Sequence, residues 1–171
     1  MMWKSIMALG LALGFVLAAS GAQAADSNSK SFIKSAIEGN YAEISVGKLA
    51  EQKGKTAAVK DYGKMLVADH TAANEKAIAA AKAIGVTPPT GSSVMEKATY
   101  LKLKVLSGDM FDRSFAKSMV SDHKNVIKEY QKESTTADAA GTYAKDALPT
   151  LQKHLAAAQK LDQQAQTTGS K

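Results

Sequence analysis

The sequence predicts an all-α protein, and three observations favour this class. The chain is rich in alanine, has only three prolines among 171 residues, and repeats its apolar residues at three- and four-residue steps. Alternating β-branched stretches, which indicate strands, are almost absent. The chain contains no cysteine, which excludes disulfide scaffolds, cysteine zinc sites, iron–sulfur ligation and thiol catalysis. Helix packing must therefore stabilise the fold.

The first half of the chain predicts two long helices joined by a short loop. An apolar stripe over residues 29–52 predicts the first helix, which Gly54 is expected to end. Thr56 is a suitable cap for the second, because its hydroxyl can accept a hydrogen bond from a first-turn amide. The second stripe continues for about 28 residues, until Gly85 and the prolines at 88–89 end it.

A short helix and a third long one are expected next. Residues 93–96 have the form of a capping box, so we expect the short helix to begin there and to end at Gly108. Asp109 is expected to cap the following helix. The apolar stripe of that helix reaches Tyr130, and the polar residues 134–136 end it.

The last helix is expected to begin near Asp138. Pro149 should kink or restart it, because proline lacks an amide hydrogen and clashes with the preceding turn. Residues 167–171 are expected to form a frayed tail. Residues 25–166 then make one helical domain, as the length of the chain also suggests.

The loop lengths indicate how these helices connect. Short loops near residues 55 and 136 make two antiparallel hairpins, while residues 85–108 are long enough to cross the molecule. One long crossover between two hairpins is typical of a ferritin-like four-helix bundle, here with a short extra helix in the crossover. An up-and-down bundle with an added helix is the competing topology.

The N-terminus has the pattern of a secretory signal peptide. Lys4 precedes an apolar run over residues 6–19, and Ala22 and Ala24 form a small-residue cleavage site. The run is too short to span a bilayer, for which about 20 apolar residues are needed. We expect residues 1–24 to be removed and the mature chain to be periplasmic. An uncleaved membrane anchor is the alternative.

The charge pattern argues against nucleic-acid binding. The formal net charge is +6, but Arg113 is the only arginine and the lysines are scattered. Recognition of phosphates and bases favours clustered arginines with aromatic residues nearby. The lysines therefore indicate solvated helix faces, and a partner in the cell envelope is the expected class of macromolecule.

Three histidines stand out, one on each of three predicted long helices. His70 and His123 both follow an aspartate, within segments that match at an offset of 53 residues, and each histidine lies on or beside an apolar stripe. Counted from the first loop, Glu43 and His70 differ in height by about 4–5 Å. Counted from the second loop, His123 and His154 differ by about 7–8 Å. His154 is therefore expected to depend on the bend at Pro149.

These residues carry a resemblance to a known family. The chain resembles the bacterial family called domain of unknown function 4142, over nearly all of the mature sequence. This resemblance implies an exported protein of ferritin-like fold whose biochemical role is not established. The residues that carry it are Phe32, Glu43, the segments 65–71, 111–112 and 119–123, and Leu148, Pro149, His154 and Leu155.

Two functions remain open. The first is binding of a transition metal (iron, copper, zinc or manganese), because imidazoles and carboxylates are a credible ligand set. The adjacent Asp-His pairs depart from the Glu-x-x-His motif of ferritin-like di-metal sites. The second is a cell-envelope or stress-related interaction protein, in which the same side chains form a buried structural network without an ion. The candidate ligands are Glu43, Asp69, His70, Asp122, His123 and His154.

No catalytic residues are predicted. The sequence has no glycine-rich phosphate loop, no nucleophile elbow and no His-Glu-x-x-His motif. The histidines therefore indicate binding or architecture more than catalysis.

Overall fold

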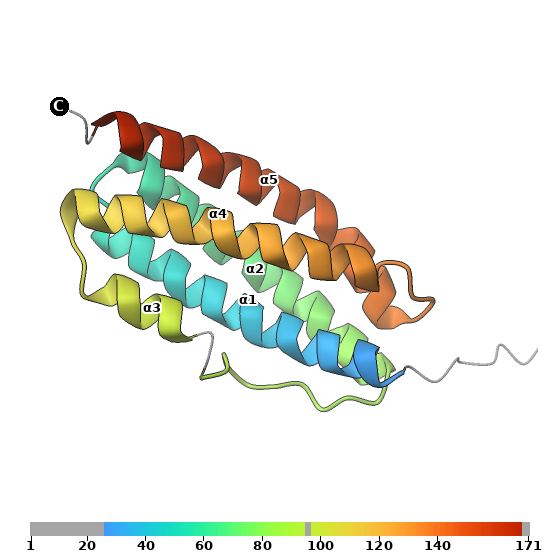
Figure 1. Cartoon of the computed structure of the whole chain (residues 1–171). Helices are drawn as coiled ribbons and strands as arrows, with labels where there is room; N and C mark the ends of the chain where they lie inside the picture. Colours follow the sequence, from blue (N-terminus) through green and yellow to red (C-terminus); the bar gives the residue numbers. More distant parts are fainter. Residues whose placement is uncertain (1–25, 95–96, 169–171) are drawn as a thin grey trace, which may run out of the picture.

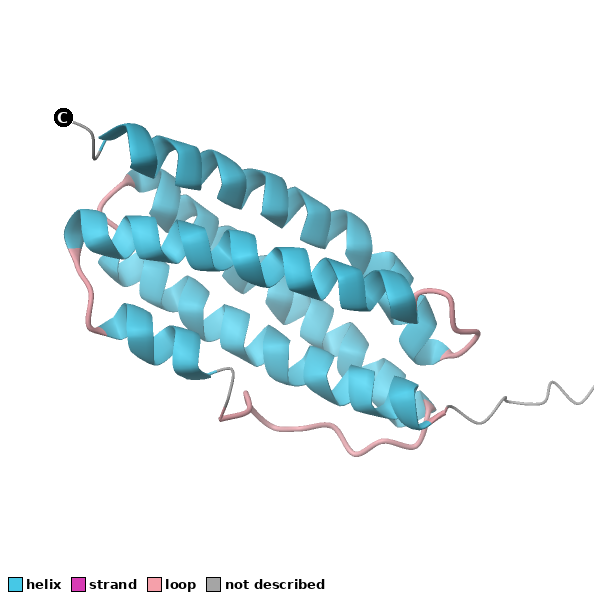
Figure 2. Cartoon of the chain, in the orientation of Figure 1, coloured by secondary structure: helices cyan, strands magenta, loops and turns pink. Residues whose placement is uncertain are grey.

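The computed structural model describes residues 26–94 and 97–168, and that part of the chain contains five helices and no strand (Figures 1 and 2). The predicted all-α class is confirmed. The predicted signal peptide, residues 1–24, lies outside the described residues. None of the described helices has the length and apolarity needed to cross a membrane. The helices are α1 (Ser27–Lys53), α2 (Ala57–Ala83), α3 (Lys97–Lys104), α4 (Gly108–Glu133) and α5 (Ala139–Thr168).

The four long helices form two antiparallel hairpins that pack against each other. Helices α1 and α2 make the first hairpin and α4 and α5 the second, with α2 also packed on α5. The segment after α2 runs back along the outside of the molecule to α3, which contacts α1 and the start of α4 (Figure 1). Helices α2 and α4 therefore run in the same direction.

Side-chain caps define three of the helix starts. Asp26 accepts a hydrogen bond from the amide of Ser29 at 2.8 Å, and Thr56 accepts one from the amide of Val59 at 3.3 Å. Asp138 accepts one from the amide of Gly141 at 2.9 Å. The predicted cap at Thr56 and the predicted start of the last helix near Asp138 are confirmed.

The predicted cap at Asp109 is wrong. Helix α4 begins at Gly108 after Ser107, so Asp109 lies inside the first turn. Its carboxylate instead pairs with the ammonium of Lys55 at 2.8 Å. A negative charge in the first turn is still favourable, because the N-terminal end of a helix carries a partial positive charge.

The short helix and Pro149 also differ from expectation. Helix α3 begins only at Lys97 and ends at Lys104, whereas the sequence predicted a start at Ser93 and an end near Gly108. The predicted capping box includes Glu96, which lies outside the described residues. Helix α5 does not restart at Pro149. Proline has no amide hydrogen, so one backbone carbonyl of the preceding turn lacks its partner, and because Pro149 is exposed, water can bind that carbonyl. The same helix includes residues 167–168, which were expected to belong to the frayed tail, and residues 169–171 lie outside the described residues.

Two glycines allow α1 and α2 to approach closely. A Cβ atom on Gly47 would lie 2.8 Å from the carbonyl oxygen of Gly63, and one on Gly63 would lie 2.6 Å from that of Gly47. Neither position has room for a side chain unless the backbones move apart. This contact fixes the distance between the two helices.

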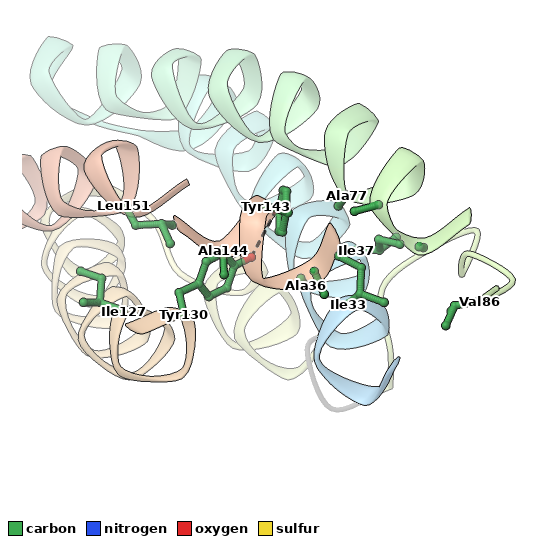
Figure 3. Packing of buried hydrophobic residues seen from close by; sticks show 13 residues of the cluster. Ile33, Ala36, Ile37, Ala77, Val86, Ile127, Tyr130, Tyr143, Ala144 and Leu151 are labelled. Atoms are coloured by element: carbon green, nitrogen blue, oxygen red, sulfur yellow. Dashed lines mark hydrogen bonds between the residues drawn. The ribbon is translucent and has the colours of Figure 1, made fainter. Parts of the chain in front are cut away.

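The apolar core is divided into two clusters. The Ile33 cluster includes Ile37, Ala77, Tyr130 and Tyr143, several of which are drawn in Figure 3. The Phe115 cluster contains a second set of buried residues from all five helices: Val46, Leu49, Ala50, Val59, Tyr62, Leu66, Leu103, Phe111, Phe115, Ala116, Met119, Ala158 and Leu161. The space between the clusters is occupied by polar side chains.

Candidate metal centre

Each long helix contributes one buried polar side chain to a layer between the two clusters. We call Asn40, His70, His123 and His154 the polar layer; none is more than 5% exposed, and His154 is fully buried. On α4, for example, His123 lies one turn from Met119 of the Phe115 cluster and one turn from Ile127 of the Ile33 cluster. The sequence prediction that the histidines face inward is therefore confirmed.

His154 reaches this layer despite the height difference expected from the sequence. Side chains of a helix tilt toward its N-terminus. Because α4 and α5 are antiparallel, the tilt carries His154 toward the loop that joins them and carries His123 away from it. The two rings converge, and His123 Nε2 lies 3.4 Å from His154 Nδ1. Counting Cα positions alone missed this convergence.

The three imidazoles form a compact group. Ring centroids are separated by 5.2 Å between His70 and His154, 5.4 Å between His123 and His154, and 6.1 Å between His70 and His123. One nitrogen from each ring lies within 4.8 Å of the other two, so the three could share one small cation.

Hydrogen bonds at the opposite side of each ring determine where its proton is. His123 Nδ1 donates to the carbonyl oxygen of Met119 at 3.0 Å, because that oxygen can only accept. His154 Nε2 donates to the carboxylate of Asp69 at 2.8 Å. His70 Nδ1 lies 2.9 Å from Asn40 Oδ1 and donates to it. Each neutral ring therefore keeps a lone pair on its other nitrogen.

These lone pairs have no protein donor to satisfy them. His123 Nε2 and His154 Nδ1 face each other at 3.4 Å as two acceptors. His70 Nε2 is buried, and no hydrogen-bond partner is found for it among the described residues. A buried acceptor without a donor costs about 1–3 kcal/mol. A cation between the rings would remove this cost.

The environment keeps all three histidines neutral. Burial, followed by the neighbouring imidazoles, lowers the pKa of His70 well below its ordinary value. Burial and the nearby His154 lower the pKa of His123 to about 4. Burial also lowers the pKa of His154, although the hydrogen bond and negative charge of Asp69 act in the opposite direction. Neutral imidazole is the form that binds metals.

The three predicted carboxylates have different positions. Asp69 contacts His154 on the side away from the other rings, so it orients a ligand instead of joining the group. Glu43 and Asp122 line a cavity beside the histidines and do not belong to the three-residue group. Burial raises the pKa of Asp122, while the charge of Lys102 lowers it. Glu43 also lies close enough to raise the pKa of the Tyr62 hydroxyl, after the larger effect of burial.

Cavities flank the polar layer on two sides. One of about 560 Å³ is lined by α1 and α4 residues, including Glu43, Met119 and Asp122, together with His70 and His123. Another of about 380 Å³ is lined by α2 and α5 residues, including Asp69 and His154, again with His70. A small molecule in either cavity would lie next to an imidazole.

Asn40 belongs to the polar layer and two tyrosines extend it. None of the three was predicted as a site residue. Asn40 Nδ2 donates to the hydroxyl of Tyr143 at 3.1 Å. The Tyr143 hydroxyl lies 3.3 Å from the hydroxyl of Tyr130, and both tyrosines are drawn in Figure 3. This donation orients the Asn40 amide so that its oxygen faces His70. The signal in the sequence was the polar Asn40 on the inward stripe of α1, about 15 residues from the loop, as His70 is.

Comparison with known proteins gives a family match for this chain: the family model described as Domain of unknown function (DUF4142) matches residues 15–161. No curated protein and no solved structure matches the chain.

Proposed function

The chain belongs to the family DUF4142, a domain of unknown function, and from this premise we propose that it binds one transition-metal ion through His70, His123 and His154. The observation that carries the proposal is the convergence of three neutral imidazole nitrogens whose lone pairs have no donor. Each ring is oriented by a separate outer partner, namely Asn40, Met119 or Asp69. Such outer hydrogen bonds are typical of histidine metal ligands.

The distances suit a first-row ion. Two nitrogens bound to one tetrahedral zinc at about 2.0–2.1 Å lie about 3.3 Å apart. The separation of His123 Nε2 and His154 Nδ1 is 3.4 Å. His70 would complete the set by a small movement, since its nitrogen lies within 4.8 Å of the other two. Neutral imidazoles favour zinc, copper or iron over manganese, which prefers oxygen ligands.

The wider fold and location belong to the same proposal. Two hairpins joined by a long crossover suggest a ferritin-like four-helix bundle. The N-terminal sequence pattern suggests export to the periplasm with removal of residues 1–24. The protein would then meet metal ions outside the cytoplasm.

Metal titration tests the proposal directly. We expect the purified protein, made without a histidine tag, to bind one equivalent of zinc or copper in calorimetry and to gain thermal stability with added metal. The chain has only three histidines. An imidazole signal from a bound cobalt ion can therefore arise only from this site. His70→Ala, His123→Ala and His154→Ala should each abolish stoichiometric binding.

Stability without metal separates the two functions left open by the sequence. If the layer only maintains structure, each alanine variant lowers the melting temperature equally with and without metal, and the parent gains nothing from metal. That result would overturn the proposal. Asp61→Ala serves as the control, because its exposed carboxylate lies on α2 away from the layer and pairs with Lys64.

A further inference from the structure

The segment that joins the two hairpins and the first turn of α4 carry exposed apolar side chains. Among the described residues, the large hydrophobic side chains that are strongly exposed are Val94, Leu101, Val105 and Met110, at 86%, 60%, 82% and 61%. All four lie within residues 94–110, and we call them the crossover patch. Concentration of such residues in one segment indicates a binding surface more than chance exposure.

The patch is held in place by contacts on the other side of α3. Leu103 is fully buried in the Phe115 cluster, so it anchors the helix to the core. The ammonium of Lys53 donates to the carbonyl oxygen of Lys104, which ties the end of α3 to α1. Leu101 and Val105 are four residues apart and point away from that anchor. The apolar side chains are therefore presented outward by a fixed support.

Positive charge surrounds these apolar side chains. Lys97, Lys102 and Lys104 are exposed on the same short helix. The acidic residues of 94–110 are Glu96, which lies outside the described residues, and Asp109, which pairs with Lys55 at 2.8 Å. The segment thus combines outward apolar side chains with three exposed lysines, of which Lys102 also acts on the carboxylate of Asp122. This combination is typical of elements that lie on anionic membrane surfaces.

We propose that the crossover patch docks the protein on an anionic phospholipid surface. The apolar side chains enter the interface and the three lysines contact lipid phosphates. A second copy of the chain is a poorer partner for this patch, because the lysines of one copy would face those of the other. The patch has four apolar side chains, far fewer than the roughly 20–30 residues on each side of a stable interface. The proposal does not depend on metal binding.

Vesicle sedimentation tests the proposal on the protein exported by a bacterial host. We expect binding to vesicles of phosphatidylcholine mixed with phosphatidylglycerol, weak binding to phosphatidylcholine alone, and loss of binding as salt is raised. Lys97→Gln with Lys104→Gln should lower partitioning by about fivefold for each lysine. Leu101→Ser with Val105→Ser should lower it at least about tenfold.

Matched controls distinguish this surface from other causes of binding. Lys124→Gln with Lys128→Gln removes two exposed charges from α4 and should leave binding unchanged. All substituted side chains are exposed, so circular dichroism and melting temperatures should match the parent. Binding that is equal on neutral and anionic vesicles, or unaffected by the patch variants, would overturn the proposal. So would a dimer in ultracentrifugation that only the patch variants disrupt.

Discussion

Asp69 determines which nitrogen of His154 keeps its lone pair. Its carboxylate accepts the Nε2 proton at 2.8 Å, so Nδ1 is left to face His123. Without this acceptor the ring can change tautomer and rotate. The role of Asp69 is therefore to orient a ligand, which the adjacent Asp-His motif alone did not reveal.

We predict that Asp69→Ala lowers zinc affinity by about 10–100-fold, the usual effect of losing an outer hydrogen bond to a metal-bound histidine. The metal-free protein should also lose about 1–3 kcal/mol of stability, because the Nε2 hydrogen of the fully buried His154 loses its acceptor. Calorimetric titration measures the effect. Asp61→Ala, on the same helix, should bind as the parent does, and an equal loss in both variants would contradict the assigned role.

The sequence predicted the three histidines and Glu43 as the inward polar residue of α1, whereas Asn40 makes the contact with His70 in the structure. Counting residues from the loop favours Asn40 over Glu43, because Asn40 and His70 both lie 15 residues from Lys55. What the sequence could not supply is the rotation of α1, which the glycine contact with α2 fixes through atoms far from the site.

At the scale of elements, Asp112 connects the two hairpins. Its buried carboxylate accepts hydrogen bonds from the amide of Lys55 at 2.9 Å and from the amide and hydroxyl of Thr56 at 3.0 and 2.9 Å. The side chain on α4 thereby provides hydrogen-bond acceptors for the backbone amides of the loop between α1 and α2. The first turn of α2 depends on this contact for its position.

We predict that Asp112→Ala lowers the free energy of unfolding by about 2–3 kcal/mol, because several hydrogen bonds to one carboxylate are lost. Asp109→Ala, one turn away on the same helix, should lower the free energy of unfolding far less, since the pair of Asp109 with Lys55 is exposed to solvent. Urea denaturation of both variants checks this. Equal losses would show that the loop does not depend on the buried carboxylate.

Helix ends were predictable where a side-chain cap defines them and were not where tertiary contacts decide. Thr56 and Asp138 are such caps. Asp109 was chosen by the same rule, but its carboxylate pairs with Lys55, a residue 54 positions away that no local pattern identifies. Pro149 was expected to kink or restart α5, and the helix continues through it without a restart.

At the scale of the whole molecule, the neutral histidines make stability depend on pH. Their pKa values lie below the unfolded value of about 6.5, so the unfolded chain binds more protons between about pH 6.5 and pH 4. Stability is then complete above the unfolded pKa and falls as the pH decreases. For His123, whose folded pKa is about 4, this linkage has a measurable size.

We predict that the metal-free protein loses about 2 kcal/mol of unfolding free energy between pH 7 and pH 5 from His123 alone, with further losses from His70 and His154. Urea denaturation at the two pH values measures the difference. His123→Gln should show a smaller change across the same interval. A parent protein equally stable at both values would contradict the buried neutral state.

The polar layer also restricts how the four long helices can slide along one another. A shift of one helix by a single turn, about 5.4 Å, would move its polar residue against aliphatic side chains of the Ile33 or Phe115 cluster. It would also break the contacts of that residue with its neighbours in the layer, such as the hydrogen bond from His70 to Asn40. Apolar stripes alone tolerate such shifts, because one aliphatic layer resembles the next. The layer therefore selects one longitudinal alignment of the helices and excludes its near neighbours.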